Sequence, residues 1–103
     1  MTKGTDLSNA VRLALSGAGH MVFRANVGKV RIADGRWFDT GLPKGFSDLF
    51  GHRGSDGRAF YIEIKAVGDR VTQDQAKFLE AMRQCGALSG VARSVDDALS
   101  IVS

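Results

Sequence analysis

The sequence predicts an α/β fold in which a mixed β-sheet is flanked by helices. Two observations indicate it. Apolar residues recur at helical spacing in three segments, near the start, in the last third and at the end of the chain. Between these segments lie short runs of alternating apolar and polar residues, bounded by glycines. The expected order is αβββαβα with an extra hairpin, in which the helices pack on a sheet.

Length and composition are those of one globular domain. The 103 residues are 44% hydrophobic and 24% charged, which is enough for a single core and excludes a disordered chain. We therefore treat residues 1–103 as one domain. No apolar run approaches the roughly 18 residues that cross a bilayer, and the N-terminal segment lacks the apolar stretch of a signal peptide. These features lead us to expect a cytoplasmic protein.

Cysteine usage excludes two further classes of protein. The single cysteine, Cys85, cannot form an internal disulfide, and no Cys/His cluster has the spacing of a zinc site. We expect Cys85 to be a packed helix residue rather than a nucleophile.

The N-terminal part of the chain predicts a helix and then a strand. Apolar residues over 6–18 follow the i, i+3, i+4, i+7 spacing of an amphipathic helix, and two glycines end it. Residues 20–27 alternate in the manner of a strand, which sets Arg24 and Asn26 on one face. Both side chains suit contact with phosphate or orientation of nearby carboxylates.

A hairpin is expected after this strand. Its strands cover 29–33 and 36–39, and Asp34-Gly35 between them is a preferred two-residue turn. The segment "TGLPKG" that follows is a loop because of its glycines and proline.

The next two strands carry the polar residues from which chemistry is inferred. They are expected over 46–52 and 59–67, and the turn "RGSDG" between them favours antiparallel pairing. Side chains alternate along a strand, so Tyr61, Glu63 and Lys65 lie on one face.

The C-terminal third predicts a helix, a strand and a helix. The first helix begins at Thr72 and runs to about Cys85, and Gly86 ends it. A short strand is expected over 87–93. Ser94 then caps the last helix.

Asp48 and Glu63 form the candidate reaction centre. Asp48 lies fifteen positions before Glu63, so antiparallel pairing can bring the two carboxylates together, although the register stays open. Carboxylates that converge repel one another unless a cation lies between them, and their hard oxygens suit Mg²⁺ or Mn²⁺. Lys65 could then orient a water and stabilise charge on a phosphate. The alternative is a solvated strand face with a loose ion pair between Glu63 and Lys65.

Two longer stretches resemble a known nuclease family. They are "GLPKGFSDLFG" and "FYIEIKAVGDRVTQDQAKFLEAMRQCG". They are similar to the PD-(D/E)xK nuclease superfamily, and within it to the VRR-NUC family of small phage and repair nucleases. That family shows a glycine-rich approach to an aspartate, an ExK strand, a loop, a glutamine early in the next helix and a glycine at its end. Upstream, "FRANVG" matches the family's arginine-asparagine-glycine stretch, and the resemblance covers nearly the whole chain.

The resemblance implies a restriction-endonuclease-like core and a metal-dependent enzyme that hydrolyses phosphodiester bonds in DNA. Asp48 and Glu63 would then be metal ligands, and the backbone carbonyl of Ile64 would complete a site for Mg²⁺ or Mn²⁺. Lys65 would be the catalytic lysine. Gln75 would be the family's glutamine beside the site.

Gln75 also has a purely structural interpretation. Together with Thr72 it fits a capping box, in which the glutamine returns a hydrogen bond to the helix start. It also lies on the inward stripe of the helix with Phe78 and Met82, where a glutamine needs a polar partner. Both interpretations stay open at this point.

Two positions depart from the family's pattern. Ser47 stands where the superfamily often has a proline before the aspartate. Related nucleases place a glutamate in the first helix, where this chain has Ser8 and Asn9 with Asp6 as the nearest acid. The second departure argues against a second metal site.

Basic residues in the middle of the chain predict a surface for nucleic acid. The net charge of +3 permits a polyanionic partner. Trp37 and Phe38 could stack on a base or wedge a duplex, or instead provide packing or dimer contacts. The candidate contact residues are Arg24, Asn26, Lys29, Arg31, Lys44 and Arg53.

The sequence therefore predicts a Mg²⁺- or Mn²⁺-dependent endodeoxyribonuclease. Small stand-alone members of the family resemble junction-resolving enzymes, which implies a role in DNA repair on branched or four-way DNA. We expect a homodimer, because two centres are needed to cut two strands and a two-fold axis supplies them. Two alternatives remain: a non-catalytic nucleic-acid-binding module, and a nuclease subunit that is active only with a helicase or targeting partner.

Overall fold

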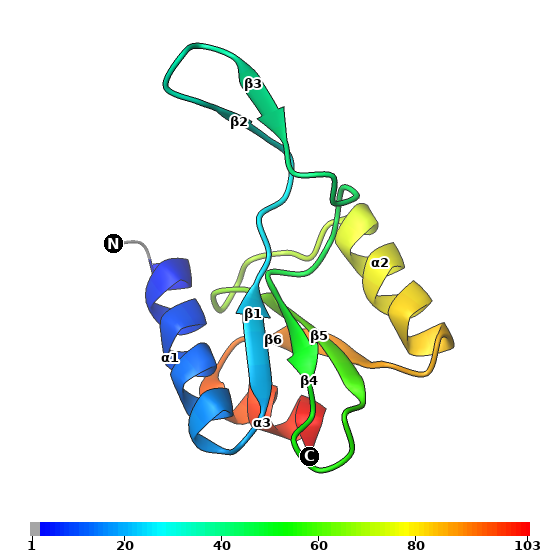
Figure 1. Ribbon diagram of the computed structural model, residues 1–103. Helices are drawn as coiled ribbons and strands as arrows, with labels where there is room; N and C mark the ends of the chain where they lie inside the picture. The colour runs from blue at the N-terminus through cyan, green and yellow to red at the C-terminus, as the bar shows by residue number, and fades with distance from the viewer. Residues whose placement is uncertain (1–2) are drawn as a thin grey trace.

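The computed structural model describes residues 3–103, except for the side chains of residues 3, 29, 30 and 38. It confirms the predicted α/β class: a four-stranded mixed sheet with three helices, and a separate two-stranded hairpin (Figure 1). The helices are α1 (Lys3–Gly17), α2 (Gln73–Gln84) and α3 (Val95–Val102). The strands are β1 (Met21–Arg24), β2 (Lys29–Arg31), β3 (Trp37–Asp39), β4 (Leu49–His52), β5 (Ala59–Ile64) and β6 (Leu88–Ala92).

The main sheet has the strand order β1-β4-β5-β6. The pairs β1–β4 and β4–β5 are antiparallel, as predicted for the second pair, whereas β5 and β6 are parallel. Parallel neighbours need a crossover connection, and α2 supplies it. No helix in residues 3–103 is long and apolar enough to span a membrane.

The two faces of the sheet are covered by different helices. Neighbouring residues of β6 show this, because their side chains point to opposite faces. A Cβ at Gly90 would meet Ile101 of α3, whereas the hydroxyl of Ser89 donates to the carbonyl of Leu79 in α2 at 2.7 Å. Helix α3 therefore covers one face and α2 the other.

The main core lies on the face shared by α1 and α3. Along each strand, the side chains that enter this core alternate with side chains on the opposite face of the sheet, as predicted from the two-residue period of a strand. The cluster consists of Val11, Leu15, Leu49, Phe60, Ile62, Ile64, Ala92, Ala98 and Val102.

Aromatic side chains hold α2 on the other face. The ring of Phe46 lies 4.6 Å from that of Phe78 in α2 and 5.9 Å from that of Tyr61 in β5, measured between centroids. Phe50 of β4 contacts Phe46 at 5.7 Å. This cluster fixes α2 against the strands that carry Asp48 and Glu63.

The hairpin turn differs from the predicted two-residue turn. The N–H of Ile32 donates to the carbonyl of Arg36 at 2.8 Å and that of Gly35 donates to the carbonyl of Ile32 at 2.9 Å, so three residues form the loop. A two-residue Asp34-Gly35 turn of the favoured type needs positive φ at both positions. Only Gly35 has it, at +89°, which is the geometry of a type I turn followed by a bulge.

Two further expectations are corrected. The strands around Asp48 are shorter than predicted, since β4 begins at Leu49 and β5 ends at Ile64. Cys85 is exposed rather than packed, because α2 ends one residue earlier and Cys85 forms its C-cap.

Candidate active site

The register between β4 and β5 brings Asp48 and Glu63 together. Leu49 pairs with Ile62, so the next pair outward is Asp48 and Glu63. Paired residues point to the same face, which here is the face covered by α2. The two carboxyls lie close enough for Asp48 to raise the pKa of Glu63. The carboxylates of Asp48 and Glu63 therefore converge, which the sequence alone had left open.

Glu63 is the most unusual ionisable residue of the site. It is 2% exposed, and its Oε2 atom has no hydrogen-bond partner among the described residues. Burial, together with the carboxyl of Asp48, raises the pKa of Glu63 to about 9, and the charge of Lys65 opposes this rise. A buried carboxyl with an unpartnered oxygen is costly, so the fold holds it here against a free-energy penalty.

Asp48 joins three strands. Its Oδ2 atom accepts the N–H of Ile64 at 2.8 Å, and its backbone carbonyl accepts the N–H of Ala25, just after β1, at 2.9 Å. The carboxylate thus takes the place of a backbone partner at the end of β5. One carboxylate oxygen of Asp48 is thereby held in a fixed position.

The carbonyl of Ile64 lies on the same edge of β5 as Asp48. In an extended strand the N–H and C=O of one residue point to the same neighbour, and the N–H of Ile64 points to Asp48. The predicted third ligand oxygen is thus directed to the side of β5 on which Asp48 lies.

Lys65 follows directly after β5. Its N–H donates to the carbonyl of Ala92 in β6 at 3.1 Å, which continues the strand direction and keeps its side chain on the Glu63 face. The side chain is half-buried, and its charge acts on the pKa of Glu63. Among the described residues it forms no ion pair.

Gln75 forms the capping box that the sequence allowed. Its Oε1 atom accepts the N–H of Thr72 at 2.9 Å, and the hydroxyl of Thr72 accepts the N–H of Gln75 at 3.1 Å. Within residues 3–103, Gln75 makes no hydrogen bond to Asp48 or Glu63. The structure therefore places it at the start of α2, as a residue that fixes the helix.

Ser47 and Gly45 have structural roles that sequence reasoning missed. Ser47 is fully buried, and its hydroxyl donates to the carbonyl of Leu49 at 2.9 Å, which stabilises the backbone on either side of Asp48. Gly45 lies against the start of α2, where a Cβ would come within 2.5 Å of the backbone of Asp74. The glycine-rich loop thus allows α2 to approach the strand that carries Asp48.

Arg24 lies on the other face from the carboxylates. It pairs with Leu49, which belongs to the α1–α3 core, so the predicted role of orienting Asp48 or Glu63 is not supported. Asn26 is exposed just beyond β1. Lys44 is highly exposed and lies 3.6 Å from Asp74 in the first turn of α2. The side chains of Lys29 and Phe38 lie outside the described residues.

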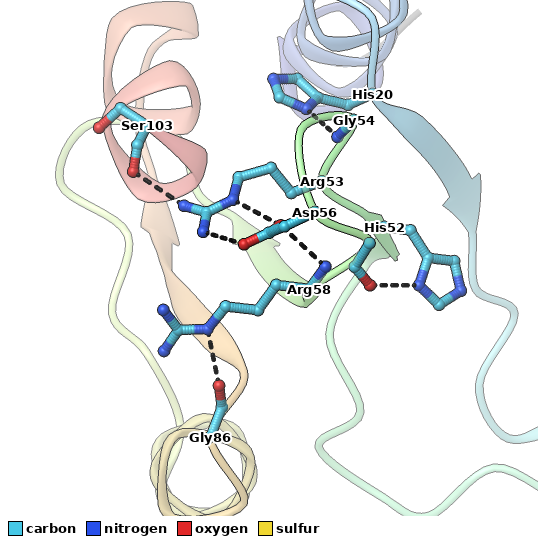
Figure 2. A network of polar contacts seen from close by, with 9 residues as sticks. His20, His52, Arg53, Gly54, Asp56, Arg58, Gly86 and Ser103 are labelled. Atoms are coloured by element: carbon cyan, nitrogen blue, oxygen red, sulfur yellow. Dashed lines mark hydrogen bonds and ion pairs between the residues drawn. The ribbon is translucent and has the colours of Figure 1, made fainter.

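Arg53 belongs to a structural network rather than to the basic surface (Figure 2). Its guanidinium donates to Asp56 at 2.6 and 3.0 Å and to the carbonyl of Ser103 at 3.1 Å. Asp56 also accepts the N–H of Arg58, whose side chain donates to the carbonyl of Gly86. The hydrogen bond from Arg53 holds the pKa of Asp56 well below its usual range.

This network lies at the end of β4 opposite to Asp48. Arg53 follows β4 directly, whereas Asp48 precedes it. Four strand residues separate them, which corresponds to roughly 13 Å or more. Arg53 therefore ties the β4–β5 turn to Ser103, away from the carboxylates, and its contact with nucleic acid stays a prediction.

The donor set at the candidate site is small. In the part of the chain that the structure describes, no group of three or more His, Cys, Asp or Glu residues could hold a metal. Two carboxylates and one backbone carbonyl remain. Mg²⁺ is commonly bound by one or two carboxylates and keeps several of its waters, so this set is compatible with it.

Comparison with known proteins identifies the family and the fold. The VRR-NUC domain model matches residues 21–96. A solved structure described as a VRR_NUC domain superposes with a TM-score of 0.70 at 18% identity, over 99% of this chain and 96% of that one. A second, described as a VRR_NUC domain protein, gives a TM-score of 0.67 at 18% identity, over 99% and 86%. No curated protein sequence matches significantly. The family match covers the sheet, Asp48, Glu63 and α2, and the chain therefore belongs to the VRR-NUC family of nuclease-type domains.

Proposed function

We propose that this protein is a Mg²⁺- or Mn²⁺-dependent endodeoxyribonuclease whose reaction centre is the Asp48–Glu63 pair. The observation that carries the proposal is the buried carboxyl of Glu63, set opposite Asp48 by the strand register, with an oxygen that has no hydrogen-bond partner among the described residues. A cation between the two carboxylates would remove the cost of burying Glu63 and bring its pKa down. If Glu63 had only a structural role, nothing would offset the free-energy cost of burying its carboxyl.

The residues that would hold the metal are Asp48, Glu63 and the carbonyl of Ile64. All three contribute the hard oxygen atoms that Mg²⁺ and Mn²⁺ prefer. When bound, such a metal supplies an activated water and offsets negative charge on a phosphate.

The chain's own residues have distinct roles in this proposal. The ammonium group of Lys65, on the Glu63 face, positions the attacking water and donates to the charged phosphate oxygens. The N–H of Ile64 holds Asp48 in one orientation. The capping box of Gln75 fixes the start of α2 against the strand that carries Asp48, which makes Gln75 a positioning residue.

The test is a pair of glutamate variants. The chain has two glutamates, Glu63 and the exposed Glu80, so Glu80→Gln removes the same charge away from the site. Glu63→Gln should abolish cleavage of DNA in Mn²⁺ and abolish the rise in melting temperature that Mn²⁺ produces, while DNA binding persists. Glu80→Gln should retain all three.

Three outcomes would contradict the proposal. Cleavage by Glu63→Gln at the wild-type rate would place the reaction elsewhere, and cleavage in excess EDTA would exclude the metal. Wild-type protein that binds DNA and never cuts it would support the non-catalytic binding module.

We further propose a homodimer that acts on branched DNA. Strand β1 is an edge of the sheet, and edge strands favour pairing with another chain unless they are protected. Met21 of this strand is 59% exposed, and Leu13 of α1, which is 77% exposed, lines a recess with Val22. The β1 edge with α1 is therefore the surface on which we place the second copy, and it would supply the second centre for a paired cut.

Light scattering tests the assembly. The expected mass is twice the 11.0 kDa of one chain, and four-way DNA should be cut in preference to linear duplex. A mass of one chain, with and without four-way DNA, would contradict the homodimer. The protein would then be an enzyme that nicks one strand at a time.

A further inference from the structure

The β2–β3 hairpin stands apart from the rest of the molecule. We call residues 28–40 the arm: its base closes where the N–H of Thr40 donates to the carbonyl of Gly28 at 3.0 Å. Within the described part of the chain, its two strands pair only with each other. Figure 1 shows it projecting beyond the end of the sheet at which β1 finishes and β4 begins. An isolated two-stranded hairpin is marginally stable in water, so a binding partner would stabilise it.

The arm presents an arginine and a tryptophan that are already stacked. The guanidinium carbon of Arg31 lies 5.7 Å from the centroid of the Trp37 ring, and Trp37 is 63% exposed. No acidic side chain of the described residues pairs with Arg31. Arg36 on the same arm differs, because its Nε atom donates to Asp34 at 2.6 Å. Arg31 therefore carries the arm's uncompensated guanidinium.

The arm is attached directly to the candidate active site. One connection leaves it through Ala25, whose N–H donates to the carbonyl of Asp48. The other runs through the loop that contains Gly45 and ends at Asp48. A nucleic-acid strand at the Asp48–Glu63 pair would thus pass the base of the arm.

A second copy of the chain fits the arm less well. Trp37 and Ile32, the exposed apolar side chains described on the arm, offer on the order of 200 Å² together. A stable dimer buries roughly 800 Å² per partner. A stacked aromatic ring with an unpaired cation matches a nucleotide instead, which offers a flat base and a phosphate.

We propose that the arm binds DNA beside the cleavage position, with Trp37 stacked on an unpaired base and Arg31 on an adjacent phosphate. The proposal rests on the nuclease function proposed above and adds a preference for unpaired bases next to the cut. It requires no metal, since neither side chain belongs to the Asp48–Glu63 pair. Binding and cleavage can therefore be measured separately.

Trp37 is the only tryptophan in the chain, so its fluorescence reports on the arm directly. In EDTA, titration with a single-stranded oligothymidylate should quench the emission to a plateau, because stacking places the indole ring against a base. A blunt duplex of equal length should quench less. Unchanged emission, while labelled DNA shows by anisotropy that it is bound, would overturn the proposal and leave the nuclease function intact.

Variants provide the second test, with affinity measured by anisotropy of labelled oligothymidylate. Trp37→Ala should weaken binding by about ten- to a hundredfold, as expected for loss of one stacked base, and Trp37→Phe should restore most of it. Arg31→Ala should weaken binding more than Arg36→Ala, although both remove one positive charge from the same arm. Circular dichroism confirms that each variant is folded.

The outcomes separate the two proposals. Equal effects of Arg31→Ala and Arg36→Ala, or wild-type affinity in Trp37→Ala, would reject the arm as a binding element. A drop to the mass of one chain in Trp37→Ala, with unchanged affinity per chain, would assign the arm to dimer formation instead. A wild-type protein that binds no DNA of any form would reject the nuclease function as well.

Discussion

The carboxylate of Asp48 accepts the backbone N–H of Ile64 at 2.8 Å, across the end of the β4–β5 ladder. This hydrogen bond has two consequences. It holds one oxygen of Asp48 in a fixed position, and it turns the edge of β5 that carries the Ile64 carbonyl towards the same carboxylate. The geometry of the candidate metal site therefore depends on a backbone contact as well as on the charges of its ligands.

Substitutions of Asp48 should separate these two contributions. Asp48→Asn keeps an oxygen that can accept the N–H of Ile64 but loses the charge, so it should fold with nearly wild-type stability and lose cleavage. Asp48→Ala should lose cleavage and also about 1–3 kcal/mol of stability, because the N–H is left without its partner. Urea unfolding in EDTA and a plasmid cleavage assay measure the two effects. Equal stability of the two variants would show that the hydrogen bond contributes little.

Glu63 should make the metal-free protein less stable as the pH rises. Its pKa is raised from 4.5 to about 9 in the folded state, so the folded protein holds the proton more tightly than the unfolded chain does. The stabilising contribution is complete below about pH 4.5 and is lost as the pH rises through about 9. Glu63→Gln should lack this decline. Urea unfolding of both proteins in EDTA, from about pH 5 to about pH 9, measures the difference.

The affinity for metal should rise with pH. A cation must displace the proton of Glu63, so Mn²⁺ should bind more tightly as the pH rises. Calorimetric titration of the wild-type protein at several pH values tests this. Affinity that does not change with pH would mean that Glu63 is ionised before the metal binds, contrary to its environment.

Gly45 should be more sensitive to substitution than Gly41. Both have positive φ, +88° and +81°, so alanine costs about 1 kcal/mol at either position. Only at Gly45 would the new Cβ lie 2.5 Å from the backbone of Asp74. We expect Gly45→Ala to lose about 1–3 kcal/mol more stability than Gly41→Ala, and to cleave more slowly because α2 is pushed away from the strand that carries Asp48. Equal losses would show that the contact relaxes without cost.

Gln75 should act through the helix start. Gln75→Ala breaks the capping box and should cost about 1 kcal/mol, whereas Gln75→Glu preserves the box. We therefore expect Gln75→Glu to keep both wild-type stability and cleavage. Thermal unfolding and a cleavage assay at a temperature where both variants are folded provide the measurement. A stable Gln75→Glu variant without activity would return Gln75 to a direct role beside the carboxylates.

Local features of the sequence determined the helices and the faces of single strands. The capping box of Thr72 and Gln75 and the cap at Ser94 depend on residues within one turn, and the structure has them as predicted. The alternation along β5 placed Glu63 and Lys65 on one face for the same reason, because the two-residue period is a property of the extended chain.

Features that depend on pairing between distant segments were decided by the tertiary structure. The sequence allowed Asp48 to meet Glu63, but their register follows from the β4–β5 ladder and the core beneath it. Arg24 was placed correctly in a strand, and its face relative to the carboxylates came only from its pairing with Leu49.

Arg53 is the clearest case. Its charge suggested a phosphate contact, yet its guanidinium donates to the carbonyl of Ser103, fifty residues along the chain. Side-chain charge and periodicity are local properties that a sequence displays directly. The partner of a charged group is set by packing that closes long loops of chain, and a single sequence does not record which of the possible closures has the lowest free energy.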